Sequence, residues 1–121
     1  MCVRGRDEEA MTFNALFTAY CFCIICVGPH FKRNPAYART TSGSRPIVGV
    51  TAACHPSRLG RVLEVSIPLH FWPFEARGLR WCEDTGSTKL KWRRKVDLFM
   101  RSHQEALDFG MRKGKAREVG R

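Results

Sequence analysis

Residues 10–29 read AMTFNALFTAYCFCIICVGP and contain no charged side chain. Acidic residues at 7–9 precede this stretch, where a helix dipole favours negative charge, and Gly28-Pro29 is a typical helix stop. The stretch has no polar face, and a helix that is apolar all round is either buried in a large protein or spans a membrane. About 20 residues suffice to cross the hydrocarbon core. We therefore predict an N-terminal apolar helix, a candidate transmembrane helix, with a single-pass membrane location and membrane lipid as a partner.

A core element is the alternative for the same stretch. Residues 20–27 are rich in residue types that favour β-strands, and the polar side chains of Thr12, Asn14 and Thr18 weaken membrane insertion. Periodicity alone does not separate a buried strand from a buried helix in so short an apolar run. A buried core strand or helix therefore stays open beside the membrane helix.

The middle of the chain predicts a β-hairpin over residues 46–68. Leu63, Val65 and Ile67 alternate with more polar neighbours, as a half-buried strand requires. Residues 47–52 form the other candidate strand, and residues 55–60 would join the two. We expect low order in residues 30–45.

The C-terminal region has the clearest helical periodicity. Its apolar and small residues recur at spacings of three and four, which is typical of one face of an amphipathic helix: Trp92, Val96, Phe99, His103, Ala106 and Gly110. We predict a basic amphipathic helix over residues 87–113, with low order beyond Gly110. The three zones are residues 1–29, 30–86 and 87–121, and the fold class expected is a small, loosely packed α+β or mainly α protein with substantial disorder.

The charge balance favours anionic partners. The net charge is +10, and residues 89–121 hold eleven basic and four acidic side chains. A small basic protein that engages nucleic acid or another polyanion through the 87–113 helix is therefore the alternative function. A solvated basic face, with the apolar stripe packed on the hairpin, is the competing interpretation. The candidate polyanion contacts are Lys89, Lys91, Trp92, Arg93, Arg94 and Lys95.

Four residues form the only cluster with metal-ligand types, the pattern C-x-C-x-x-C-x-x-x-H of Cys21, Cys23, Cys26 and His30. The intervening apolar residues favour regular structure over a knuckle turn, and the remaining cysteines and histidines lack a second tight pair. We therefore interpret these cysteines as small buried hydrophobes and expect no zinc and no cofactor. The N-terminus lacks the positive region of an export signal, so we expect all six cysteines to be free thiols.

No motif of nucleophilic, phosphate-binding or metallopeptidase chemistry occurs in the sequence, so we expect no enzyme and no small-molecule substrate. Arginine occurs fifteen times and lysine six, which is the balance that unselected codons give. One hypothesis is therefore a recently arisen or spurious open reading frame without an evolved biochemical function.

Overall fold

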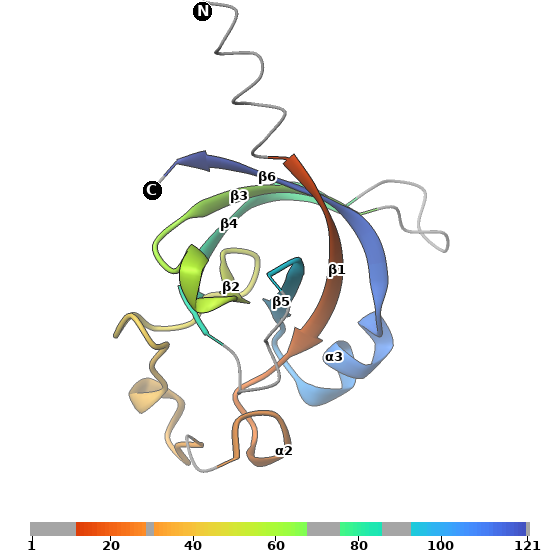
Figure 1. Cartoon of the computed structure of the whole chain (residues 1–121). Coiled ribbons are helices and arrows are strands. Elements are labelled where there is room, and N and C mark those ends of the chain that lie inside the picture. Colours follow the sequence, from red (N-terminus) through yellow and green to blue (C-terminus); the bar gives the residue numbers. More distant parts are fainter. Residues whose placement is uncertain (1–11, 29–30, 68–75, 86–92, 121) are drawn as a thin grey trace, which may run out of the picture.

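Six β-strands close into a barrel in the computed structural model, which describes residues 12–28, 31–67, 76–85 and 93–120 (Figure 1). The order of strands around the barrel is β1-β5-β2-β4-β3-β6. The fold is therefore mainly β, and the predicted α+β or mainly α class is wrong. The strands are β1 (Thr12–Tyr20), β2 (Thr51–Cys54), β3 (Val62–Ile67), β4 (Ala76–Asp84), β5 (Lys95–Phe99) and β6 (Arg112–Gly120). The helices are α2 (Ile24–Val27) and α3 (His103–Phe109), with short 3-10 segments η2 (Pro35–Tyr37) and η3 (Pro56–Arg58).

The predicted transmembrane helix at residues 10–29 is wrong, because its central part is strand β1. This strand pairs in parallel with β5 and antiparallel with β6. Ala15 and Phe17 point into the barrel core, while Tyr20 is buried in a second cluster. The outer face of the strand changes along its length, from exposed Thr12 and Asn14 to buried Tyr20, so only its end is covered on both sides. Among the residues that the structure describes, no helix is long and apolar enough to span a membrane, which removes the basis for a membrane location.

The predicted hairpin at residues 46–68 is also wrong, although one of its strands is right. β3 has the expected period of two, with Leu63, Val65 and Ile67 buried. The other strand, β2, begins only at Thr51, and it does not pair with β3. β4 lies between them, parallel to β2 and antiparallel to β3. The two predicted strands therefore both pair with β4 and do not pair with each other.

The predicted helix at residues 87–113 is replaced by three elements in its described part: β5, α3 and the start of β6. Val96 and Leu98 are buried at strand spacing, and only residues 103–109 are helical. Two segments expected to have low order are ordered where the structure describes them. The chain beyond Gly110 forms β6, and Ala38 and Thr40 are buried within the irregular segment that includes η2.

A disulfide between Cys54 and Cys82 lies in the barrel core, and both residues are fully buried. The prediction of six free thiols is therefore wrong for this pair. Cys21, Cys23 and Cys26 carry free thiols. The core cluster that contains the disulfide has members from every strand of the barrel, and the largest of its fully buried apolar side chains are Phe17, Leu63, Val65, Ile67 and Val96.

Two carboxylates lie on the outer side of the barrel, near the end of β1. Thr18 Oγ1 donates a hydrogen bond of 3.0 Å to Asp97 Oδ1. Tyr20 Oη donates one of 3.0 Å to Asp84 Oδ2, and burial together with Asp84 raises the pKa of Tyr20 above its ordinary value. Burial raises the pKa of Asp97 to about 6, against the opposing effects of Thr18 and of Lys95.

Gly114 of β6 lies where the neighbouring strand comes closest, and we expect Gly114→Ala to destabilise the barrel. A Cβ at this position would collide with the backbone oxygen of Ser66 and would lie 3.0 Å from Cε2 of Phe17. Overpacking of this kind costs about 1–3 kcal/mol. Urea unfolding measures the change, with the exposed neighbour Lys113→Ala as the control. Equal stability of the two variants would show that β6 does not approach β3 so closely.

Asp97 gives the stability of the protein a pH dependence. Because the folded state binds this proton more tightly than the unfolded chain, the contribution of Asp97 is most favourable below pH 4 and is lost as pH rises towards 6. The loss is about 3 kcal/mol at most. Asp97→Asn keeps an acceptor for Thr18 and should remove this loss. Unfolding of both proteins at pH 4.5 and pH 7.5 measures it, and a parallel pH response in the two proteins contradicts the prediction.

Candidate metal centre

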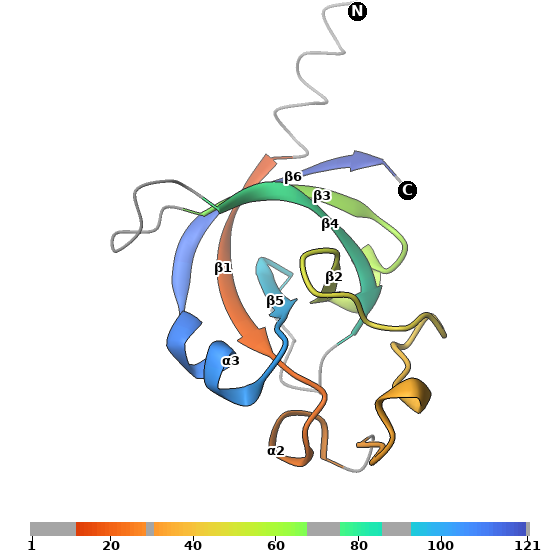
Figure 2. The ribbon, with the colours of Figure 1, turned by 180° about the vertical axis from the view of Figure 1, so that it is seen from behind.

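Three thiols and one imidazole meet beside the barrel. The ligand atoms of Cys21, Cys23, Cys26 and His103 all lie within 4.8 Å of one another. Cys21 and Cys23 lie between β1 and α2, Cys26 lies within α2, and the histidine is the first residue of α3. Figures 1 and 2 place α2 and α3 next to each other at one end of the barrel. Cys21 is buried and the other three residues are half-buried, so the cluster lies just beneath the surface.

Three separations within the cluster match those of ligands around a tetrahedral zinc ion. Bonds of about 2.3 Å to sulfur and about 2.0 Å to nitrogen place two sulfurs about 3.8 Å apart, and a sulfur and a nitrogen about 3.5 Å apart. The Sγ atoms of Cys21 and Cys26 are 3.8 Å apart. Nδ1 of His103 lies 3.5 Å from Sγ of Cys23 and 3.4 Å from Sγ of Cys26. Each of these three separations agrees with a shared central ion.

A tight turn at the start of α2 presents two of the thiols. The backbone N–H of Cys26 donates to Sγ of Cys23 over 3.4 Å, and that of Val27 donates to the carbonyl oxygen of Cys23 over 2.9 Å. A Cys-x-x-Cys segment folded in this way directs both thiols to one point. The apolar residues between the cysteines were expected to disfavour a knuckle turn. The structure accommodates Cys23-x-x-Cys26 in one short helical turn instead.

The first turn of α3 fixes the histidine. Ser102 is the N-cap, and its side chain accepts a hydrogen bond of 3.2 Å from the backbone N–H of Glu105. The Glu105 carboxylate in turn accepts one of 3.1 Å from the N–H of Arg101. This reciprocal capping orders the residues on both sides of His103.

A backbone hydrogen bond ties the two ligand-bearing segments together. The N–H of Met100 donates to the carbonyl oxygen of Tyr20 over 2.7 Å. Tyr20 directly precedes Cys21, and Met100 lies three residues before His103. The bond extends the parallel pairing of β1 with β5, in which Tyr20 stands opposite Phe99. Parallel strands end at the same edge of a sheet, so the segments that follow them emerge side by side.

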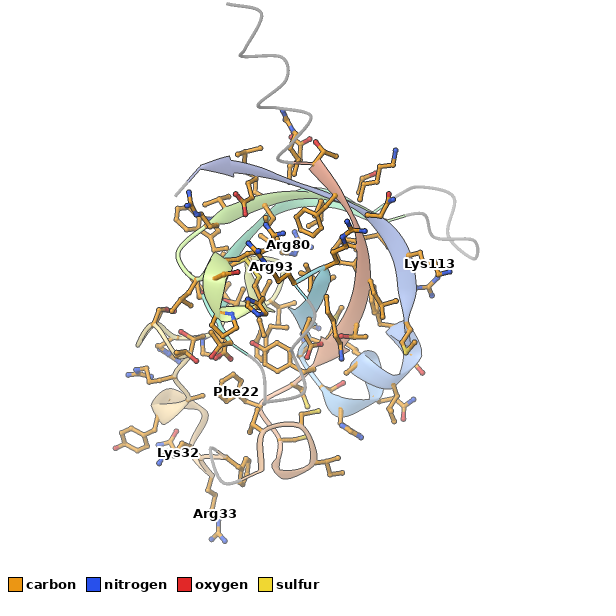
Figure 3. All side chains as sticks on the ribbon, in the orientation of Figure 1. Phe22, Lys32, Arg33, Arg80, Arg93 and Lys113 are labelled. Atoms are coloured by element: carbon orange, nitrogen blue, oxygen red, sulfur yellow. A yellow bond between two sulfur atoms is a disulfide. The ribbon has the colours of Figure 1, made fainter. Side chains whose placement is uncertain are left out.

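Aromatic packing fixes the cysteine segment on the outer wall of the barrel. The rings of Tyr20, Phe22 and Phe99 contact one another, with centroids 5.6–6.1 Å apart. Together with the buried Ala53 they form a second hydrophobic cluster, into which Cys26 and Val27 also pack. Figure 3 shows Phe22 between the barrel and α2. The thiols are therefore positioned by the packing of the chain, before any ion is considered.

The three thiols differ in acidity. Burial, followed by hydrogen bonds with the other two thiols, raises the pKa of Cys21 to about 12. Burial also raises the pKa of Cys26. Burial acts in the same direction on Cys23, but hydrogen bonds from Cys21 and from the backbone of Cys26 outweigh it and lower the pKa of Cys23 to about 7. Three thiolates this close repel one another, and a bound cation would remove that repulsion.

The sequence pattern named the cysteines of this cluster but not its histidine. His30 lies outside the described residues, and the imidazole comes instead from a residue 77 positions beyond Cys26. His103 had been assigned to the apolar stripe of a long helix. No local spacing relates it to the cysteines, and only the pairing of β1 with β5 brings it near. The cysteine spacing was thus the one available signal.

The candidate polyanion contacts do not form a helix face in the described part of the chain. Lys89, Lys91 and Trp92 lie outside the described residues. Arg93 and Arg94 are exposed, and Lys95 is the half-buried first residue of β5. The carbonyl oxygens of Arg93 and Arg94 accept hydrogen bonds from Nε of Arg58 and from the N–H of Leu16.

Comparison with family models, curated proteins and solved structures gives no match.

Proposed function

We propose that the protein is a zinc-binding β-barrel in which Cys21, Cys23, Cys26 and His103 hold a structural zinc ion. The observation that carries the proposal is the convergence of these four ligand atoms within 4.8 Å of one another, with three of their separations at the values that tetrahedral zinc requires. This proposal replaces the expectation of no metal, because the fold brings the imidazole of His103, which the sequence pattern did not include, to the three thiols.

The donor set favours zinc over other common metals. Three sulfurs and one nitrogen are soft or borderline ligands, whereas magnesium, calcium and manganese prefer oxygen. Cys3His is one of the ligand sets of structural zinc sites, which are four-coordinate and closed. With four protein ligands, no coordination position remains for a water or a substrate. The proposed role is therefore structural rather than catalytic.

Zinc would fasten α2 to α3 and both to the barrel. The four residues of α2 make a helix too short to be stable alone, since isolated helices below about 12 residues are marginal in water. The aromatic cluster of Tyr20, Phe22 and Phe99 positions this segment, and the metal would lock it. A ligand that binds only the folded state adds about 4 kcal/mol of stability at a thousand times its dissociation constant.

A redox-active dithiol is the second candidate for the same residues. Cys23 and Cys26 form a C-x-x-C pair, and the lowered pKa of Cys23 is a property of such pairs. A dithiol needs only these two residues, however. It gives no reason for the third thiol of Cys21, 3.8 Å from Cys26, or for the imidazole of His103. Zinc uses all four, so we favour the metal.

We expect the full-length protein, purified from zinc-supplemented cells, to contain one zinc per chain by elemental analysis. His103→Ala should lose most of the zinc, because it removes one of four ligands. His103→Cys should keep it, because a fourth thiolate restores a tetrahedral site. His55→Ala is the matched control, since His55 is the N-cap of η3 and its side chain bonds to Ser57 instead. It should keep the full zinc content.

Two results would overturn the zinc proposal. One is equal zinc content in the His103→Ala variant and in the wild-type protein, which would place the metal elsewhere. The other is a zinc-free protein in which mass spectrometry of thiol-labelled peptides finds a Cys23–Cys26 disulfide, which would favour the redox pair. Far-ultraviolet circular dichroism of each variant separates loss of the ligand from loss of the fold.

A further inference from the structure

A row of cations lies on the outer face of β6. Ala116 points into the barrel core, so the alternating neighbours point outward. These outward residues are Lys113, Lys115 and Arg117, and Figure 3 shows Lys113 directed away from the barrel. Both lysines are exposed, and neither has an ion-pair partner among the described residues. Alternate side chains on a strand are about 7 Å apart, so the row presents three separated charges.

The strands on either side of β6 extend this surface with few acidic groups. Lys115 stands opposite Asn14 on β1 and Ser66 on β3. Arg117 stands opposite Glu64, and their side chains form an ion pair of 3.3 Å. Both side chains are more than one-third exposed, so this pair is weak and an anionic ligand can compete for the arginine.

Exposed apolar side chains lie on the same face, two strands away on β4. Leu79 is 50% exposed and Trp81 is 44% exposed. Leu79 pairs with Glu64 across β3, which places it about 10 Å from Arg117. A hollow lies over β3 and β4, and Leu79 is one of its lining residues. The described residues that line the hollow are Glu64, Val65, Ser66, Gly78 and Leu79.

No described helix covers this surface. Figures 1 and 2 show the outer side of the arc of β6, β3 and β4 bare of helices, while α2 and α3 gather at one end of the barrel. An exposed tryptophan leaves apolar surface in contact with water, and a partner that covers this surface gains free energy of binding. The cations on β6, two strands away on the same face, indicate that the partner is anionic.

We propose that the outer face of β6, β3 and β4 binds single-stranded nucleic acid. Lys113, Lys115 and Arg117 contact successive phosphates, and an unpaired base stacks on Trp81. A basic surface next to an exposed aromatic ring is the arrangement that single strands require, because every base offers a π-face for stacking. The proposal concerns a different surface from the zinc site and does not depend on it.

Two other anionic partners fit the surface less well. In a duplex the bases are already stacked, so Trp81 would add nothing to binding. A lipid bilayer is reached by side chains that protrude into it, whereas Trp81 lies within the nine-residue strand β4, between β3 and β2. Both partners are included in the test as alternatives.

The test measures binding of the full-length protein to a fluorescein-labelled 20-nucleotide single strand by anisotropy, at about 150 mM salt. The Lys113→Ala/Lys115→Ala double variant should bind at least about tenfold more weakly. The slope of the logarithm of its association constant against the logarithm of the salt concentration should be shallower by about 1.4, since each phosphate contact on a single strand contributes about 0.7. The matched control is Lys32→Ala/Arg33→Ala, which removes the same charge from exposed residues on another part of the surface (Figure 3). It should bind within about twofold of the wild-type protein.

Trp81 supplies the second arm of the test. Trp81→Ala should weaken single-strand binding by about fivefold or more, whereas Trp81→Phe, which keeps an aromatic ring, should bind nearly as well as the wild-type protein. Equal losses in the Lys113/Lys115 and Lys32/Arg33 variants would show attraction by net charge alone and overturn the proposal. Tighter binding to a 20-base-pair duplex, or to phosphatidylserine vesicles, than to the single strand would overturn it as well.

Discussion

The parallel pairing of β1 with β5 is the interaction on which the rest of the structure depends. It runs from Leu16 opposite Lys95 to Tyr20 opposite Phe99, and it joins segments almost 80 residues apart. β1 also pairs with β6, so one N-terminal strand fills the gap between two C-terminal strands and closes the barrel. Because both strands of the parallel pair end at the same edge, Cys21 and His103 emerge next to each other. Barrel closure and ligand assembly are thus two results of one register.

The cysteines divide into two chemical environments as a consequence of this closure. Cys54 and Cys82 are enclosed in the core and joined by a disulfide, out of reach of solvent reductants. Cys21, Cys23 and Cys26 follow β1 outside the barrel, where an imidazole faces them. Metal binding would slow thiol–disulfide exchange at these three cysteines, because a coordinated thiolate is a weaker nucleophile than a free one. The barrel interior and the metal centre therefore keep their cysteines apart by position.

Local patterns predicted the parts of the fold that depend on nearest neighbours and missed those that depend on distant ones. The alternation of Leu63, Val65 and Ile67 correctly gave β3, because a strand with one buried face repeats every two residues. Val96 and Phe99 fitted a helical spacing equally well, and only the pairing with β1 selects a strand there. The uncharged run before Cys21 resembled a membrane helix because β1 buries Ala15 and Phe17 in the core and carries uncharged residues on its outer face. The sequence pattern identified the three cysteines of the proposed metal site, whereas it did not relate His103 to them.

The most direct test of the account is X-ray absorption spectroscopy at the zinc edge of the metal-loaded protein, because it counts the ligands by element. We expect three sulfur atoms at about 2.3 Å and one nitrogen atom at about 2.0 Å from the metal. That shell would show that Cys21, Cys23 and Cys26 share one ion with an imidazole, as the pairing of β1 with β5 requires. A shell of oxygen and nitrogen alone, or one with fewer than three sulfurs, would contradict the account.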